Sequence, residues 1–92
     1  MTSLNVQLVS AIFANDSDLI KSLLDQGMDV NDNGIFTIPP LLRAALYGKS
    51  KALKTLIECG ADKAIKDKQG HTAIELARKH NHQKIIDILL QN

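Results

Sequence analysis

The feature that most constrains the fold of this 92-residue chain is its similarity to itself at an offset of 33 residues. At this offset Gly27 falls on Gly60 and Asp29 on Asp62. Apolar residues also coincide in all copies, in the sets Leu8, Leu41, Ile74; Ala11, Ala44, Ala77; Leu19, Ala52, Ile85; Ile20, Leu53, Ile86; Leu23, Leu56, Leu89; and Leu24, Ile57, Leu90. A period of this length is typical of stacked structural units. The sequence therefore predicts three such units.

Each unit is predicted to hold two short helices. In the third unit we expect helices from Ala73 to about Lys79 and from about Gln83 to Leu90, because their apolar residues follow the i, i+3, i+4 spacing of a buried face. Alanine recurs at one column because a small side chain lets neighbouring helices approach closely. A core poor in aromatic residues, with 3% in the whole chain, also favours closely packed helices over a sheet sandwich.

The helix ends are marked by residues that tolerate a left-handed backbone. Asn15, Gly48 and Asn81 occupy equivalent places between the two helices of each unit, and glycine also follows the second helix of the first two units. Ser17 and Ser50 lie where a hydroxyl can cap the second helix.

Two segments of the chain resemble the ankyrin repeat. These are Gly-His-Thr-Ala-Ile-Glu-Leu-Ala at 70–77 and Leu-Ile-Glu-Cys-Gly-Ala-Asp at 56–62, and the family shares the 33-residue period. The resemblance implies an all-α, ankyrin-like solenoid of three helix-turn-helix repeats with hairpin-like loops. It would form one domain over residues 1–92, with units at about 3–35, 36–68 and 69–92 and a truncated first unit acting as a cap.

The second unit departs from the family pattern. Thr37, Pro39 and Leu42 stand where the family has Gly, Thr and His. These departures leave the path of residues 28–39 open, with Asp-Asn-Gly at 32–34 as a candidate turn. Pro40 still suits the first turn of a helix.

Ankyrin-like proteins generally bind partners through loop tips and the concave face formed by the first helices. Carried over position by position, the resemblance predicts a partner-binding surface of Phe13, Phe36, Ile38, Leu46, Tyr47, His71, Lys79 and His80. All aromatic residues of the chain fall here, outside the columns predicted as core. A cluster of this kind has the composition of an interaction site. The alternative is that Phe36 and Ile38 fold over the first helices and enlarge the core.

Catalytic and metal chemistry find no support in the sequence. The histidines lack further ligands at metal-binding spacing, and Cys59 has no suitably placed histidine to activate it. The glycines are isolated, so no phosphate-binding loop is predicted, and we expect neither enzymatic activity, nor a cofactor, nor a small-molecule substrate. A single cysteine, and no apolar stretch long enough for a signal peptide or a membrane span, indicate a cytoplasmic protein.

Three functions are compatible with these features. The first is a protein-protein interaction module, for example an inhibitor or immunity-like factor. The second is a homo-oligomeric structural or assembly component that uses the same apolar patch. The third and weakest is nucleic-acid binding through the lysines of the basic part of the chain, since residues 1–32 carry a net charge of −4 and residues 33–92 one of +5.

Overall fold

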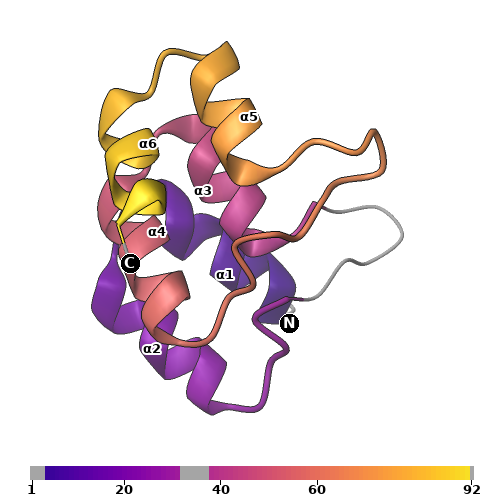
Figure 1. The fold of residues 1–92 in the computed structure, drawn as a ribbon. Coiled ribbons are helices and arrows are strands. Elements are labelled where there is room, and N and C mark those ends of the chain that lie inside the picture. The colour runs from indigo at the N-terminus through magenta and orange to yellow at the C-terminus, as the bar shows by residue number, and fades with distance from the viewer. Residues whose placement is uncertain (1–3, 32–37, 92) are drawn as a thin grey trace.

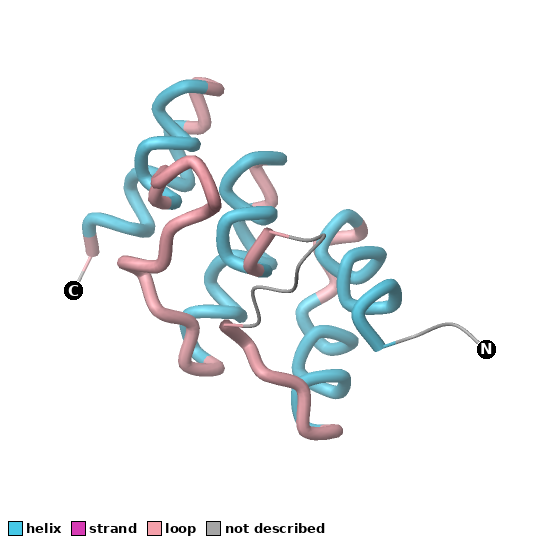
Figure 2. The backbone as a smooth tube through the Cα atoms, turned by 90° about the vertical axis from the view of Figure 1, so that its right-hand side faces the viewer, coloured by secondary structure: helices cyan, strands magenta, loops and turns pink. Residues whose placement is uncertain are grey.

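Six helices form two layers in a computed structural model that describes residues 4–31 and 38–91. The helices are α1 (Leu4–Phe13), α2 (Ser17–Asp25), α3 (Pro40–Tyr47), α4 (Ser50–Glu58), α5 (Ala73–Lys79) and α6 (Gln83–Leu90). Figure 1 labels them, and Figure 2 shows the three helix pairs side by side from the N-terminus to the C-terminus. The all-α repeat architecture predicted from the sequence is confirmed, including the bounds of both helices in the third unit.

Each helix packs within its own pair and against its counterpart in the next pair. Helices α1, α3 and α5 form one layer, while α2, α4 and α6 form the other. The alanine column lies where these helices meet, and Ala11, Ala44 and Ala77 are all fully buried. Because alanine has no side chain beyond Cβ, the helices of one layer can approach closely along this column.

The predicted core columns are mostly buried, but single positions on the two outermost helices are exposed. Ala52 and Ile85 are 0% and 1% exposed, whereas Leu19 in the same column is 41% exposed. Leu90 is 63% exposed, although it shares a column with Ile57, which packs against the core. Helices α2 and α6 are the outermost helices of their layer, so no further helix of the described chain covers these side chains. The expectation that every column is core throughout was therefore wrong at both ends.

The connection between the two helices of each unit is a tight left-handed turn, as predicted. Asn15, Gly48 and Asn81 have φ angles of 57°, 71° and 60°. The prediction that Ser17 and Ser50 cap the following helices is wrong, because both are already the first residue of the helix rather than the residue before it. Asp16 caps α2 instead, and its carboxylate accepts a hydrogen bond from the Leu19 backbone N–H at 3.1 Å.

Neighbouring units are joined by hydrogen bonds from a side chain of one to the backbone of another. The Asn15 side-chain oxygen accepts from the Ala52 N–H at 2.8 Å, so the first unit caps helix α4 of the second. In the loops, the Asn31 side-chain oxygen accepts from the Asp62 N–H, also at 2.8 Å. The Lys63 ammonium donates to the Gln91 carbonyl at 3.0 Å. Packing and polar contacts therefore fix the units in the same register.

The role of Asn15 can be tested with a graded series of substitutions. Asn15→Ala loses both the bond to Ala52 and the tolerance for a left-handed backbone, so we expect the free energy of unfolding to fall by about 2 kcal/mol. Asn15→Gly loses only the bond and is expected to cost about 1 kcal/mol, whereas Asn15→Asp keeps the acceptor and is expected to match the wild type. Urea denaturation measures the free energy of unfolding of the wild type and of each variant. A glycine variant as stable as the wild type would show that the bond contributes nothing.

The loop between α4 and α5 extends away from the two helical layers (Figure 1). At its tip the Asp67 N–H donates to the His71 carbonyl and the Gly70 N–H donates to the Asp67 carbonyl, each at 3.0 Å. These bonds close a hairpin-like turn, which confirms the predicted loop type for this connection. The proposed turn at residues 32–34 lies outside the described residues.

A candidate partner-binding surface

Two exposed aromatic rings lie against each other across the boundary between the first and second units. Phe13 is the last residue of α1 and Tyr47 the last residue of α3. Their ring centroids are 4.5 Å apart, their planes are inclined by 40°, and they are 45% and 41% exposed. Such tilted pairs are favourable in themselves. The pair still leaves a large apolar area facing solvent, which is the property expected of an interaction site.

Leu46 and Ile38 are less exposed than the sequence predicted. Both side chains are half-buried and pack against the hydrophobic core. For Ile38 this agrees with the alternative interpretation, in which it enlarges the core. Phe36, the third aromatic residue of the predicted surface, lies outside the described residues.

The basic members of the predicted surface divide between two places. Lys79 ends α5 and His80 follows it, and both are exposed. They lie near the end of α3, because the His82 ring nitrogen Nε2 is 3.1 Å from the Leu46 carbonyl and the His82 ring is 6.2 Å from that of His80. The structure therefore brings Phe13, Tyr47, Lys79 and His80 to the C-terminal ends of the first helices. We call these four residues the aromatic–basic row.

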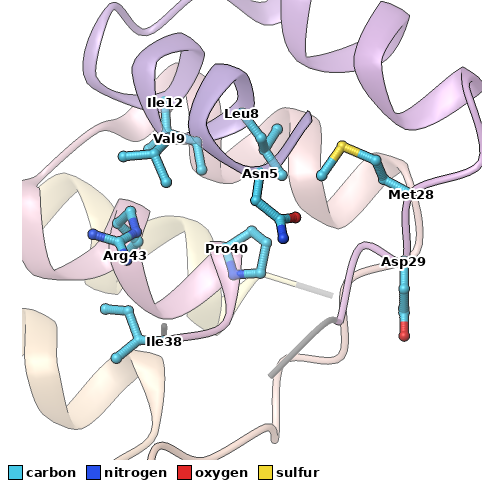
Figure 3. Close-up of a pocket in the computed structure, with 9 residues that line it drawn as sticks. All are labelled: Asn5, Leu8, Val9, Ile12, Met28, Asp29, Ile38, Pro40 and Arg43. Carbon is cyan, nitrogen blue, oxygen red and sulfur yellow. The ribbon is translucent and has the colours of Figure 1, made fainter. Parts of the chain in front are cut away.

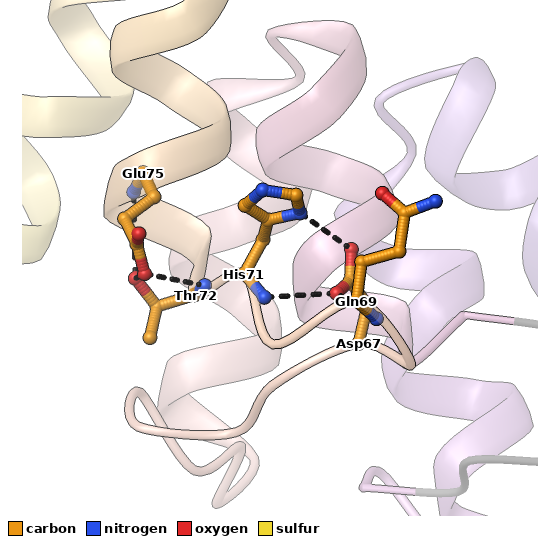
Figure 4. A network of polar contacts seen from close by, with 5 residues as sticks. All are labelled: Asp67, Gln69, His71, Thr72 and Glu75. Carbon is orange, nitrogen blue, oxygen red and sulfur yellow. Dashed lines mark hydrogen bonds and ion pairs between the residues drawn. The ribbon is translucent and has the colours of Figure 1, made fainter.

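His71 lies at the opposite end of α5 and is engaged within its own loop (Figure 4). Its ring nitrogen Nδ1 is 3.5 Å from the Asp67 carboxylate, which also accepts the backbone N–H groups of His71 at 2.8 Å and Gln69 at 2.9 Å. The His71 N–H is the largest cause that lowers the pKa of Asp67 below its ordinary value of 3.8. His71 therefore shapes the loop tip as well as being available at its surface.

A capping box fixes the start of α5. The Thr72 hydroxyl accepts from the Glu75 N–H at 3.4 Å, and the Glu75 carboxylate accepts from the Thr72 N–H at 3.1 Å. The bond from the Thr72 backbone is the largest cause that lowers the pKa of Glu75 below its ordinary value of 4.5. The carboxylates of Asp67 and Glu75 are therefore both already engaged in hydrogen bonds within the loop and the start of α5.

The stability contributed by the Asp67 carboxylate is expected to depend on pH. Because the pKa of Asp67 is lowered in the folded chain, its ionised form stabilises the fold above the ordinary value of 3.8 and loses this effect as the pH falls through the folded-state pKa. Asp67→Ala should therefore lower the midpoint of thermal unfolding at pH 7. The difference in midpoint between this variant and the wild type should shrink as the pH falls below 3.8. Thermal melts followed by circular dichroism from pH 2 to 8 measure this; Asp25→Ala is the control, since the Asp25 side chain has no hydrogen bond within the described residues. A difference that is constant with pH would contradict the prediction.

A small hollow lies between α1 and α3, on the side of Met28 (Figure 3). It is lined by Asn5, Leu8, Val9, Ile12, Met28, Asp29, Ile38, Pro40 and Arg43. Of the predicted surface residues that the structure describes, Ile38 alone borders it. Among the described residues that line it, Asp29 and Arg43 carry charged groups and most of the others are apolar.

Sequence reasoning missed the residue that joins the second and third units at the end of the row. This residue is His82, whose ring nitrogen Nε2 lies 3.1 Å from the Leu46 carbonyl at the end of α3 and whose ring lies beside Gly48. The available signal was the absence of a side chain at Gly48 in the column of Asn15 and Asn81. Within residues 4–31 and 38–91, no three His, Cys, Asp or Glu residues are grouped so that they could hold a metal ion. No helix in the same ranges has the length and hydrophobicity to cross a bilayer.

Comparison with known proteins places the chain in a family. The profile described as ankyrin repeats in three copies matches residues 8–92, and the chain belongs to the ankyrin repeat family. It is 34% identical over 82 residues to the potassium channel GORK of Arabidopsis thaliana, covering 89% of this chain and 10% of the channel. It is also 34% identical over 95 residues to a putative ankyrin repeat protein of Coxiella burnetii, covering 91% of this chain and 28% of that protein.

A third relative is the ARF GTPase-activating protein Git of Drosophila melanogaster, which is 33% identical over 90 residues, covering 95% of this chain and 12% of Git. The chain therefore spans between about a tenth and three tenths of these relatives. Ankyrin repeats generally mediate protein-protein interaction, and the family is typically non-enzymatic.

Proposed function

We propose that the chain binds another protein through the aromatic–basic row. The observation that carries this proposal is the Phe13–Tyr47 pair, in which two large rings remain 45% and 41% exposed although taking such a side chain from full exposure to full burial is worth roughly 1.5–3 kcal/mol. Leu46, which precedes Tyr47 in the chain, is half-buried and packs against the core. Ile38 and His71, at the opposite ends of α3 and α5, would extend the contact toward the loop tips.

The consequence for the cell would be the masking of a partner, as an inhibitor or immunity-like factor does. A rigid stack of short helices presents a preformed surface, and binding to such a surface loses little conformational entropy. The proposed location is the cytoplasm, because the single thiol of Cys59 is free and exposed and suits a reducing compartment. No part of this proposal requires a cofactor or catalytic group.

The proposal is tested by removing the exposed rings while leaving the stack intact. We expect Phe13→Ser with Tyr47→Ser to weaken the affinity for a co-purifying partner at least tenfold, because exposed aromatic anchors dominate binding energy. Partners are identified by affinity purification and mass spectrometry, and dissociation constants are measured by isothermal titration calorimetry. Leu19→Ser is the matched control, since Leu19 is an apolar residue that is 41% exposed, like Tyr47, but lies on α2. Equal weakening by both changes, or none by the double variant, would contradict the proposed surface.

Self-association through the same Phe13–Tyr47 pair is a second candidate function, because an exposed pair of rings can pair with a second copy of itself. Light scattering between low and high micromolar concentration distinguishes it from the first. A mass that rises with concentration in the wild type, but not in the Tyr47→Ser variant, would favour self-association. A constant monomer mass would exclude it.

A further inference from the structure

The aromatic–basic row changes its chemistry along the stack. In the first two units it presents the apolar rings of Phe13 and Tyr47. In the third unit the same two columns hold Lys79 in place of Phe13 and Leu46, and His80 in place of Tyr47. The exposed Arg78 precedes them. One continuous row of positions is thus apolar at one end and basic at the other.

The basic end of the row has no carboxylate to neutralise it within the described residues. The Asp67 carboxylate is occupied by the loop tip, and the Glu75 carboxylate is occupied by Thr72 at the start of α5. The Asp67 carboxylate also forms an ion pair with the His71 ring at 3.5 Å. The Lys79 ammonium therefore faces solvent, and an incoming anion would not have to displace an internal partner.

The His80 ring is held in place by its neighbour. It stacks on the His82 ring with an angle of 22° between the planes, and His82 is itself fixed by the Leu46 carbonyl at 3.1 Å. Through this chain of contacts the basic end of the row is tied to the end of α3, which carries Tyr47. The two kinds of chemistry therefore belong to one rigid surface.

We infer that the partner contributes a polypeptide segment with an apolar anchor and a carboxylate, the anchor contacting Phe13 and Tyr47 and the Asp or Glu side chain facing Lys79 and His80. This inference rests on the proposed function and adds the chemistry of the partner. Charge complementarity at the unneutralised end selects an acidic group, and the exposed rings select an apolar one.

The geometry also gives the spacing within that segment. Packed helices lie 8–10 Å apart, so the row covers roughly 16–20 Å from α1 to α5. The anchor contacts touching rings on α1 and α3, so it lies about one and a half helix spacings, or about 12–15 Å, from α5. An extended segment advances about 3.3 Å per residue, so the acidic residue should lie about four positions from the apolar anchor. A segment with both groups at this separation can contact both ends of the row at once.

The test is a selection from a phage-displayed library of random 12-residue peptides against the folded chain. We expect selected peptides to combine Asp or Glu with an aromatic or aliphatic residue about four positions away. Synthetic copies of these peptides are then titrated against three variants whose folding is checked by circular dichroism. These are Phe13→Ser with Tyr47→Ser, Lys79→Glu with His80→Glu, and, as the control, Lys51→Glu with Lys54→Glu on exposed positions of α4.

The expected result is at least a tenfold increase in the dissociation constant for each of the first two variants and less than a twofold change for the control. A selection repeated on the Lys79→Glu, His80→Glu variant should yield basic rather than acidic peptides. Peptides that depend on Phe13 and Tyr47 but lack an acidic residue, or bind the charge-reversed variant within twofold, overturn the inference and leave the proposed function standing. Peptides that bind the Phe13→Ser, Tyr47→Ser variant as well as the wild type, or no enrichment at all, contradict the proposed function and the inference with it.

Discussion

Replacing Leu56 by alanine is expected to lower the free energy of unfolding by about 2–5 kcal/mol, which is a large share of the roughly 5–14 kcal/mol available to a domain of this size. The Leu56 side chain is 0% exposed and lies on α4, in the middle of its layer. Removing three carbon atoms there loses their burial and leaves a cavity that helices packed on both sides cannot close. Urea denaturation followed by circular dichroism measures the change.

The repeat supplies two matched controls for this prediction. Leu23 and Leu89 occupy the same column as Leu56 in the first and third units. Leu23 is also buried, so Leu23→Ala should cost nearly as much, whereas Leu89 is half-buried on the outermost helix α6 and its loss should cost under about 2 kcal/mol. If Leu89→Ala proves as damaging as Leu56→Ala, burial by neighbouring units is not what makes this column stabilising.

The second large effect is expected at Gly48, where backbone conformation and cross-unit packing coincide. Its φ of +71° favours glycine, and a Cβ atom built there would lie 2.7 Å from Nδ1 of His82. Gly48→Ala would therefore strain the backbone, at about 1–2 kcal/mol, and push the His82 ring away from the Leu46 carbonyl, at about 1 kcal/mol more. We expect a total loss of about 2–3 kcal/mol, measured by thermal and urea denaturation.

Further variants separate the two causes. Gly60→Ala is the backbone control, since Gly60 has a φ of +98° but nothing lies within 4 Å of the added Cβ. Gly48→Asn should tolerate the left-handed backbone, as Asn15 and Asn81 do, yet still displace His82. In the His82→Ala background, Gly48→Ala should cost only its backbone strain. If it costs the same in both backgrounds, the ring contact has no energetic role.

The periodicity of the sequence was sufficient to predict the helices, the turns between them and most of the core. Apolar columns at a fixed offset report which face each helix buries, and Asn15, Gly48 and Asn81 report where the backbone must turn left-handed. The columns could not report how many neighbours a unit has. The repeat therefore predicted Leu19 to be as buried as Ala52, although the exposure of Leu19 depends on what covers α2.

The candidate surface was less predictable because its members depend on contacts between units. Helical phase placed Phe13 and Tyr47 outside the core columns, but it did not reveal that the two rings touch. Leu46 differs from Tyr47 by one position, about 100° around the helix, and that rotation carries its side chain to the edge of the core. The engagement of His71 by Asp67 and of Leu46 by His82 depends on loop and turn geometry, which no spacing in the sequence encodes.

The side chains of Asn15, Asn31 and His82 each bond to the backbone of the second unit, so the middle of the stack has backbone hydrogen bonds supplied by both of its neighbours. If either outer pair melted, the second unit would be left with an N–H or a carbonyl that had lost its partner. Fraying from either end is thereby discouraged, and the three pairs should respond to heat or denaturant as a single cooperative body, even though each is held together mainly by local contacts.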